Sequence, residues 1–532
     1  MKKVVFCFFA SVLLNAQSID ISKFYYRDYL DFGQGYGAFN GENSGKANTS
    51  NSTTLTDKDG TKVSVPNVPN FSASSNYGSL TSVGRGFAVT ANHVSSPTGA
   101  DGLLRWGLTD YKIAEQENGD VGGISKPYGR DEKFIRLDKY VVEGQVDMLD
   151  TPNSLVSTNA TQEQENINKF KTELKNFKDE NGNIYIYQAG SGIVSLRGTS
   201  SEQGFNTNGS GEMKGGGFGT LGESNIQYGC LVQTQSCDSR GIWFYYHPNG
   251  DFNNRITSGD SGSGIYAYNT TKKEWVLLGV TSRATSGVNR AEISFISNKD
   301  LEDYRKSFEQ KIALTTNQNY TINNQGLNDE SFQGNKDIIF SGGGNIQVTN
   351  NIYRNVSGQA GGFVFTATNS ATKDNPTKYI FTNKYDKANI FAGSGLDIEQ
   401  NVVVEWALRN QSGDSLHKIG KGELIVKTNY TPTSKENLGT LKIGEGKVTL
   451  DTNKKAFENI YITSGRGELA LVSGKAQALG ATKNDTNSAS GATSANSYTL
   501  AQESTDKMGF YFGKGGGKFD LAGNSLVLNT IA

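Results

Sequence analysis

The sequence has little cysteine, proline or histidine, and it has no long apolar run beyond its first residues. In 532 residues there are 3 Cys, 8 Pro and 3 His. A membrane-spanning helix needs about 20 consecutive apolar residues, and no stretch reaches that length. Lys and Arg number 52 against 53 Asp and Glu, which leaves a formal net charge of −1. This balance gives no indication of binding to nucleic acid or to an anionic membrane surface.

Glycine is abundant, with 64 residues, and it interrupts short runs of β-branched and aromatic side chains. Such side chains are enriched in strands, so the composition predicts a β-rich secreted protein. A chain of 532 residues is also too long for one ordinary domain, and we expect two or more.

The first 16 residues have the pattern of an export signal. A basic start, Met1-Lys2-Lys3, precedes an apolar core at residues 4–14, and the small residue Ala16 offers a cleavage point. We therefore expect the mature chain to begin at Gln17 or a neighbour. A lipoprotein signal is not favoured, because Cys7 lies inside the apolar run rather than after it.

The mature chain would keep only Cys230 and Cys237, which stand close together between turn residues. In an oxidising compartment a local disulfide is the default. Closing so short a loop would contribute about 2.5 kcal/mol. A metal site at these cysteines is not favoured, because no His or third Cys is close to them in the sequence.

The tetrapeptide Gly259-Asp260-Ser261-Gly262 suits a serine nucleophile. The Ser261 hydroxyl would attack, and Gly259 would let the N–H groups of Gly259 and Ser261 converge as an oxyanion hole. Each donor of that kind typically stabilises a transition state by about 3–4 kcal/mol. In a chain with 64 glycines the same tetrapeptide could also be an ordinary loop.

His93 is the candidate base. It follows a short apolar, β-branched run from residue 86, which predicts a buried strand leading into a tight turn. His247 stands at the end of an aromatic stretch and is expected to be structural. The order His93 then Ser261 favours catalysis over a structural histidine. The acid of a triad cannot be chosen from position alone, because many carboxylates lie between the two.

Four segments share one resemblance. They are YYRDYLDFG at residues 25–33, the turn at His93, FIRLDKYVVE at residues 134–143, and GDSGSG at residues 259–264 followed by WVLLGV at residues 275–280. Together they resemble the passenger of Gram-negative serine protease autotransporters, the group of the IgA-specific proteases and the enterobacterial enzymes. The resemblance implies an all-β fold class, with a chymotrypsin-like double β-barrel followed by the start of a right-handed parallel β-helix.

The resemblance also implies the acid. In the family the catalytic Asp lies five residues before the Arg of the third segment, which is Arg136 here, so the position is Asp131. Asp120 is the alternative, because residues 121–130 form an insertion. Asp131 stands in the charged run RDEK at residues 130–133, which could also be a solvated surface.

The predicted activity is that of a secreted serine endopeptidase with no metal or other cofactor. His93 would act as base and then acid, Asp131 would orient it, and Ser261 would form the acyl-enzyme. The expected partners are extracellular host proteins as substrates, with immunoglobulin or mucin as candidates, and no nucleic acid. The alternative is an adhesin or cytotoxin passenger whose protease site is vestigial or serves self-processing only.

Candidate substrate contacts follow from the same resemblance. Arg255, six residues before the nucleophile, would lie at the base of the primary pocket and favour an acidic or polar group, or else be a surface residue. The run at residues 279–282 predicts a strand that pairs with substrate backbone, so Val280, Thr281 and Ser282 are candidate contacts. The chain has no Ile-Val-Gly-Gly start, so Asp260 needs a partner other than a new N-terminal amine, and the N-terminal segment is a candidate.

The chain changes character near residue 300. Residues 298–308 predict a short helix, and the strands after it, cornered by Gly and Asn, are too closely spaced for crossover helices and predict a solenoid. Five such strands are expected at residues 337–340, 345–348, 362–365, 396–398 and 402–406. The segments DSLHKIGKG (414–422) and GTLKIGEGKVTL (439–450) resemble the autotransporter β-helix repeat, which makes His417 a rung residue. Residues 475–496, rich in Ser, Ala, Thr, Gly and Asn, predict a flexible loop or side insertion.

The resulting domain map has a signal peptide at 1–16, a chymotrypsin-like serine protease domain at 17–310, and the N-terminal part of a β-helix stalk at 311–532. Full-length autotransporters continue through a longer β-helix to an outer-membrane translocator barrel. We therefore expect a fragment or truncated product, whose full-length protein has that translocator as a partner. Its expected route leads through the periplasm to the cell surface or the medium.

Overall fold

The computed structural model describes most of the chain beyond residue 16. The described residues are 17–20, 22–39, 50–95, 97, 104–116, 120–121, 124–125, 131–149, 159–190, 194–197, 206–207, 215–221, 226–228, 242–245, 252, 259–284, 290–296, 298–355, 358–385, 388–431, 436–483, 497–499, 509–513 and 515–527. The signal peptide, His247, Arg255 and the two cysteines of the predicted disulfide lie outside them.

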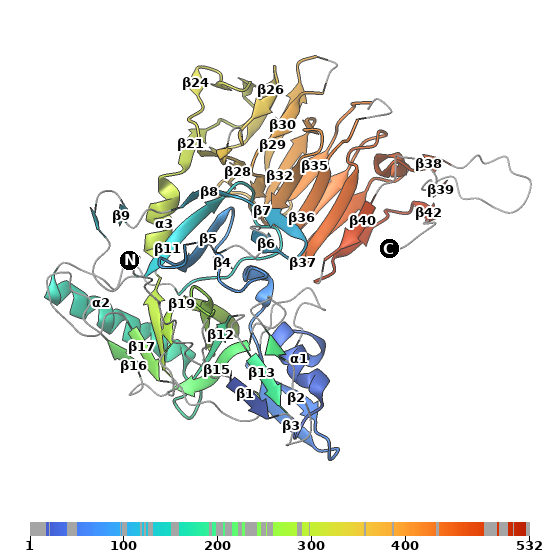
Figure 1. Ribbon diagram of the computed structural model, residues 1–532. Coiled ribbons are helices and arrows are strands. Elements are labelled where there is room, and N and C mark those ends of the chain that lie inside the picture. Colours follow the sequence, from blue (N-terminus) through green and yellow to red (C-terminus); the bar gives the residue numbers. More distant parts are fainter. Residues whose placement is uncertain are drawn as a thin grey trace, which may run out of the picture.

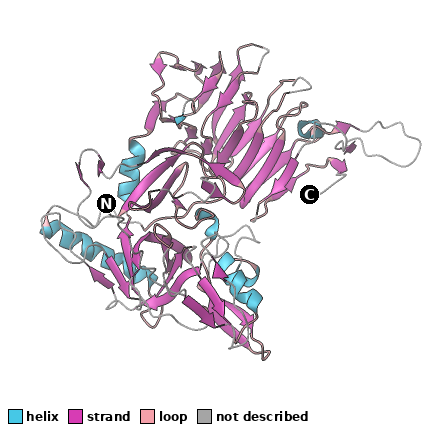
Figure 2. Cartoon of the chain, viewed as in Figure 1, coloured by secondary structure: helices cyan, strands magenta, loops and turns pink. Residues whose placement is uncertain are grey.

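Strands make up most of the described chain, and helices are few (Figure 2). The α-helices are α1 (Tyr26–Gln34), α2 (Ala160–Glu173) and α3 (Asn298–Lys306). The predicted all-β fold class is confirmed. In the part of the chain that the structure describes, no helix has the length and apolar character needed to cross a membrane.

The first half of the chain builds two antiparallel sheets. The smaller has the order β4 (Thr81–Ser82), β5 (Phe87–Ala91), β11 (Glu132–Leu137), β8 (Ile113–Gln116). The larger has the order β15 (Gly215–Leu221), β12 (Ile184–Ala189), β18 (Gly264–Asn269), β19 (Glu274–Ala284), β20 (Arg290–Phe295), β17 (Ile242–Tyr245), β16 (Ile226–Tyr228). Every residue of β5 and β11 is buried, so these two strands form a rigid support for the turns at their ends.

Short hairpins and a parallel pair complete this half. They are β1 (Gln17–Asp20) beside β13 (Val194–Arg197) and β14 (Asn206–Thr207), β2 (Ser52–Thr56) with β3 (Lys62–Pro66), β6 (Leu104–Trp106) with β7 (Thr109–Tyr111), and β9 (Asp120–Val121) with β10 (Ile124–Ser125).

Two helices arise in segments for which the sequence predicted no helix. In α1, Tyr29 and Phe32 are buried in an aromatic cluster around Phe252. The Asp28 carboxylate accepts a hydrogen bond from the Tyr25 N–H at 3.0 Å, which caps the start of this helix. In α2 the sequence is largely polar, and the buried Phe170 packs against the second sheet.

From residue 309 the chain winds into a coil of stacked parallel strands (Figure 1). One face stacks β21 (Glu309–Ala313), β25 (Asp337–Ser341), β28 (Phe363–Phe365), β31 (Leu396–Ile398), β34 (Ser415–Ile419) and the first half of β36 (Thr440–Leu450). A second stacks β22 (Asn319–Ile322), β26 (Gly344–Val348), β29 (Thr377–Asn383), β32 (Val402–Trp406), β35 (Glu423–Val426) and the second half of β36. Both faces continue through β37 (Asn459–Leu471) to β40 (Gly509–Phe512) and β41 (Lys518–Asp520).

Shorter strands fill the corners and the end of the coil: β23 (Gly326–Leu327), β24 (Glu330–Ser331), β27 (Ile352–Tyr353), β30 (Ile390–Ala392), β33 (Arg409–Asn410), β38 (Thr482–Lys483), β39 (Ser497–Thr499) and β42 (Ser525–Val527). Inward-facing apolar side chains of successive turns form one continuous core. The predicted β-helix and its five strands are confirmed, as is the short helix α3 before it.

The prediction of a flexible loop at residues 475–496 was wrong in its first part. A 3₁₀ helix at Ala476–Leu479 and strand β38 follow β37, and Ala476, Leu479 and Ala481 are buried. These small apolar side chains fill the end of the coil interior, which a composition-based argument could not distinguish from a solvated loop. Residues 484–496 lie outside the described part of the chain.

The smaller antiparallel sheet lies between the larger sheet and the parallel coil (Figure 1). Buried or half-buried ion pairs join it to the coil. Arg85 Nη1 lies 2.6 Å from Glu309 Oε1, and Lys139 Nζ lies 2.7 Å from Asp414 Oδ1. The two halves of the chain therefore share a charged, largely buried interface.

His417 lies in β34, as expected for a rung residue, and it also belongs to this interface. Its Nδ1 donates to the Tyr140 carbonyl at 2.7 Å, because a carbonyl oxygen can only accept. Its Nε2 then accepts from the Ser415 hydroxyl at 2.9 Å. Burial, and to a lesser extent the nearby Lys442 and Lys139, lowers the pKa of His417 well below its ordinary value. His417 is therefore neutral and has a structural role.

Candidate active site

His93 lies at the turn that follows β5, where that strand meets the start of β11. The two strands are antiparallel, with Ala91 opposite Glu132. The Asn92 N–H donates to the Asp131 carbonyl at 2.5 Å, and the Val94 N–H closes the turn on the Ala91 carbonyl at 3.1 Å. The β-ladder therefore brings Asp131, the residue before β11, to His93, the second residue after β5, across 38 positions of sequence.

The imidazole of His93 contacts the carboxylate of Asp131. Nδ1 lies 2.5 Å from Oδ2, and the His93 backbone N–H donates to Oδ1 at 3.0 Å. The Ser282 hydroxyl donates to Oδ2 at 2.7 Å. In the neutral imidazole the carboxylate accepts from Nδ1–H, so Nε2 has the free lone pair. The His93 side chain is about half exposed.

Of the two acids considered from the sequence, the structure joins His93 to Asp131. Asp120 is the first residue of β9, in a separate two-stranded hairpin. Residues 131–133 of the charged run are not a solvated surface. Glu132 and Lys133 are buried, and Asp131 is largely buried.

The loop carrying Ser261 packs against the end of β5. Gly262 has φ of +79°, and a Cβ placed on it would lie 2.2 Å from Thr90 Oγ1 and 3.0 Å from the Ala91 nitrogen. Its N–H donates to the Thr281 carbonyl at 2.8 Å. The residue after Ser261 is therefore in contact with the strand that ends two positions before His93.

Gly259 has φ of +97°, a left-handed conformation that glycine adopts without strain. Among the described residues, no backbone carbonyl accepts a hydrogen bond from the N–H of Gly259 or Ser261. The Asp260 side chain between them is buried beside Gly190, where a Cβ would lie 2.0 Å from Oδ1. The loop thus turns Asp260 inward, while the Ser261 side chain is half-buried.

The predicted substrate strand needs correction. Val280 pairs with Gly264 of β18 on one side and with Ser294 of β20 on the other. The Thr281 N–H donates to the Ser263 carbonyl at 2.8 Å, and its carbonyl accepts from Gly262. Val280 and Thr281 therefore lie inside the sheet, with no free backbone groups for a substrate. The Ser282 side chain donates a hydrogen bond to Asp131, a contact that no local sequence signal indicated.

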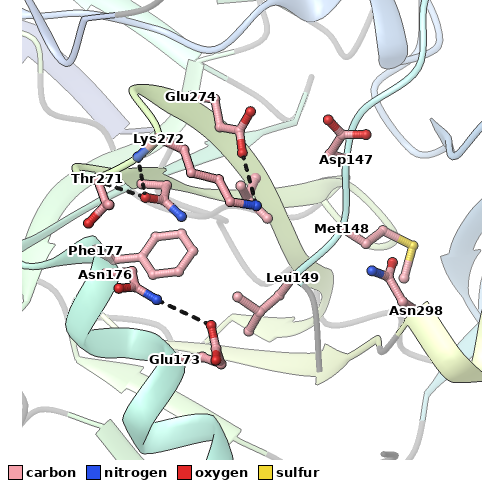
Figure 3. A pocket seen from close by; sticks show the side chains of 12 residues that line it. Asp147, Met148, Leu149, Glu173, Asn176, Phe177, Thr271, Lys272, Glu274 and Asn298 are labelled. Atoms are coloured by element: carbon pink, nitrogen blue, oxygen red, sulfur yellow. Dashed lines mark hydrogen bonds and ion pairs between the residues drawn. The ribbon is translucent and has the colours of Figure 1, made fainter. Parts of the chain in front are cut away.

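A cavity of about 340 Å³ opens at the other end of β19 (Figure 3). Its floor is apolar and its rim is charged, with Asp147, Met148, Leu149, Glu173, Asn176, Phe177, Asn269, Thr271, Lys272, Glu274, Val276 and Asn298 around it. On the rim, Lys272 Nζ lies 3.7 Å from Glu274 Oε1. Since β19 runs from this cavity to Ser282, the cavity is distinct from the His93 site. Within the described residues, no group of three or more His, Cys, Asp or Glu side chains could hold a metal ion.

Comparison with known proteins identifies the family. The profile of the immunoglobulin A1 protease family of peptidases matches residues 17–300. The chain belongs to this family. The resemblance to the group of the IgA-specific proteases is thereby confirmed.

The family members most similar to the chain include the serine protease EspP of Escherichia coli, which is 31% identical over 530 residues, covering 97% of this chain and 34% of EspP. The immunoglobulin A1 protease autotransporter of Haemophilus influenzae is 28% identical over 310 residues, covering 52% of this chain and 16% of that protein. The chain therefore spans about a third of the length of EspP.

Among solved structures, the passenger domain of plasmid encoded toxin, an autotransporter enterotoxin from enteroaggregative Escherichia coli, superposes with a TM-score of 0.65. It is 25% identical, and the match covers 94% of this chain and 44% of that one. The likeness extends across both the antiparallel half and the parallel coil of this chain.

Proposed function

We propose that this chain is a secreted serine endopeptidase that hydrolyses peptide bonds of extracellular proteins. One observation carries the proposal: the contact of His93 Nδ1 with the Asp131 carboxylate at 2.5 Å, beside the Gly-Asp-Ser-Gly loop packed on the same strand. Family membership and relatives named serine proteases support the reaction class.

In the proposed mechanism Ser261 attacks the scissile carbonyl while His93 Nε2 takes its proton. Asp131 keeps the proton of the neutral imidazole on Nδ1 and stabilises the imidazolium that forms. His93 then protonates the leaving amine. A water molecule, deprotonated by His93 in the same way, attacks the acyl-enzyme and releases Ser261. The N–H groups of Gly259 and Ser261 would hold the oxyanion, each contributing about 3–4 kcal/mol.

Export and domain organisation belong to the same proposal. Relatives named autotransporters support a route to the cell surface or the medium of a Gram-negative bacterium, with a translocator in the full-length protein. The profile match at residues 17–300 agrees with a protease domain at 17–310 between a signal peptide and the β-helix stalk. Extracellular host proteins such as immunoglobulin and mucin are the proposed substrates.

The decisive experiment is labelling with a fluorophosphonate probe, which reacts only with an activated serine. We expect the wild-type chain to be labelled, and Ser261→Ala and His93→Gln to be unlabelled while melting at the wild-type temperature. Cleavage of casein, immunoglobulin and mucin should follow the same pattern. Equal labelling of wild type and Ser261→Ala would exclude Ser261 as the nucleophile, and a wild type that takes no label would favour a passenger whose protease site is vestigial.

A further inference from the structure

Strand β11 begins with two charged residues that are buried. Glu132 is 0% exposed and Lys133 is 5% exposed. Removing a charge from water costs several kcal/mol unless it is paired and hydrogen-bonded. Both residues follow Asp131 directly, and both contact the turn or strand that holds the His93–Asp131 pair. Their burial beside the active site calls for an explanation beyond packing.

Glu132 acts on Asp131 through a serine of the neighbouring sheet. The Ser294 hydroxyl oxygen accepts a hydrogen bond from the Asp131 N–H at 2.7 Å, and the same hydroxyl donates to Glu132 Oε2. A hydroxyl has a single proton. Because the carboxylate of Glu132 takes it, the lone pair of Ser294 faces Asp131. Glu132 thus sets the direction of the bond that ties the Asp131 backbone to β20.

Lys133 acts on His93 from the other side of β11. Its Nζ donates to the Val94 carbonyl at 2.7 Å. The two preceding residues of the turn, Asn92 and His93, donate their N–H groups to Asp131. Three consecutive residues of the histidine turn are therefore held by Asp131 and Lys133, at and just before the start of β11, which restricts rotation of the turn about the end of β5.

We propose that Glu132, through Ser294, and Lys133, through Val94, are positioning residues for the proton transfer between His93 and Ser261. This inference rests on the proposed function. Reacting groups lose rate steeply when they are displaced by about 1 Å, even if the substrate still binds. Loosening either contact should therefore lower kcat and leave KM nearly unchanged.

The first test compares single variants of the full chain on a peptide substrate. We expect Ser294→Ala and Lys133→Met to lower kcat at least tenfold with KM within twofold of wild type. Lys133→Arg, which keeps a donor and a charge, should stay within threefold. The matched control is Ser82→Ala, a buried serine of β4 whose hydroxyl has no partner among the described residues, and it should leave kcat unchanged.

The second test asks whether Glu132 works through Ser294. Glu132→Met should lose as much kcat as Ser294→Ala, and the double variant should lose no more than either single one, because both act on the bond between Ser294 and the Asp131 N–H. Glu132→Gln can still accept through its amide oxygen and should retain most activity. If Ser294→Ala does not fold, Ser294→Cys, nearly isosteric but weakly hydrogen-bonding, serves in its place.

Three outcomes would overturn the proposal: losses that multiply in the double variant, a fall in melting temperature with kcat unchanged, or an effect on KM alone. The failure of the proposed function looks different, since wild type itself would then take no fluorophosphonate label. A labelled wild type with equally reactive Ser294→Ala and Lys133→Met variants rejects the positioning role only.

Discussion

Arg136 and Asp337 form a buried ion pair between the antiparallel half of the chain and its parallel coil. Nη2 lies 3.0 Å from Oδ1, and the two side chains are 2% and 1% exposed. The same Oδ1 accepts the Gly362 N–H at 2.8 Å, so the carboxylate also holds the coil backbone. Each half of the molecule therefore contributes one charge of this buried pair.

Breaking this pair should destabilise the whole chain. Arg136→Met leaves the buried Asp337 carboxylate without its ion-pair partner, and breaking such a pair typically costs about 3–5 kcal/mol. The free energy of unfolding in urea measures the loss. The control is Arg105→Met, which removes a partly exposed pair with Asp110 at 2.5 Å and should cost less than about 1 kcal/mol. Equal losses in the free energy of unfolding would show that the buried pair contributes no more to stability than the exposed one.

Glu143 should make stability depend on pH. Burial raises its pKa from 4.5 to about 7, although Tyr111 donates a hydrogen bond to it at 2.7 Å. The folded state therefore holds a proton that the unfolded state releases near pH 4.5. This contribution to stability is complete below pH 4.5 and is lost as the pH rises through about 7. The loss amounts to about 3 kcal/mol.

The measurement compares wild type with Glu143→Gln by urea unfolding at pH 4.5 and 7.5. We expect the stability of wild type relative to the variant to fall by about 3 kcal/mol over this range. The pKa of His417 is lowered, so its contribution to stability rises with pH below the ordinary histidine pKa of 6.5. Both proteins contain His417, so this contribution cancels in the comparison. A difference that stays constant with pH would contradict the prediction.

Gly262→Ala should abolish activity. A methyl group there would lie 2.2 Å from Thr90 Oγ1 and 2.8 Å from the Ser79 carbonyl, so the Ser261 loop would have to move off β5. Gly182→Ala separates this clash from backbone strain, because Gly182 has nearly the same φ, +80° against +79°, and nothing within 4 Å of its Cβ position. That control should cost about 1–2 kcal/mol and keep full fluorophosphonate labelling. Normal labelling of Gly262→Ala would refute the packed position of the loop.

Ser282→Ala should slow catalysis without affecting the fold. It removes the hydroxyl that donates to Asp131 Oδ2 at 2.7 Å. A hydrogen bond to a charged group is worth about 1.5–3 kcal/mol, and part of it supports the imidazolium in the transition state. We expect kcat to fall about tenfold. Ser415→Ala, which removes the hydroxyl on His417, is the matched control and should leave kcat as it is.

Much of the fold could be predicted from local patterns. The strands Leu396–Ile398 and Val402–Trp406 begin and end where alternation and glycine or asparagine corners predict them. The helix α2 was not predicted, because its sequence is polar and only tertiary packing gives Phe170 a buried position. The buried segment after Gly474 was missed for the same reason, since alanine-rich sequence fits a loop as well as a core.

The candidate site could likewise be predicted only in part from local sequence. Ser261 and His93 are recognisable in the sequence, because a nucleophile loop and a histidine turn each depend on a few adjacent residues. The strand ladders that join distant segments pair His93 with Asp131 rather than Asp120. They also bring the Ser282 hydroxyl to donate a hydrogen bond to the Asp131 carboxylate. The same ladders bury the charged side chains of Glu132 and Lys133 at the start of β11. Which carboxylate meets a histidine is a matter of register between strands, and register arises only when the sheets assemble around their core.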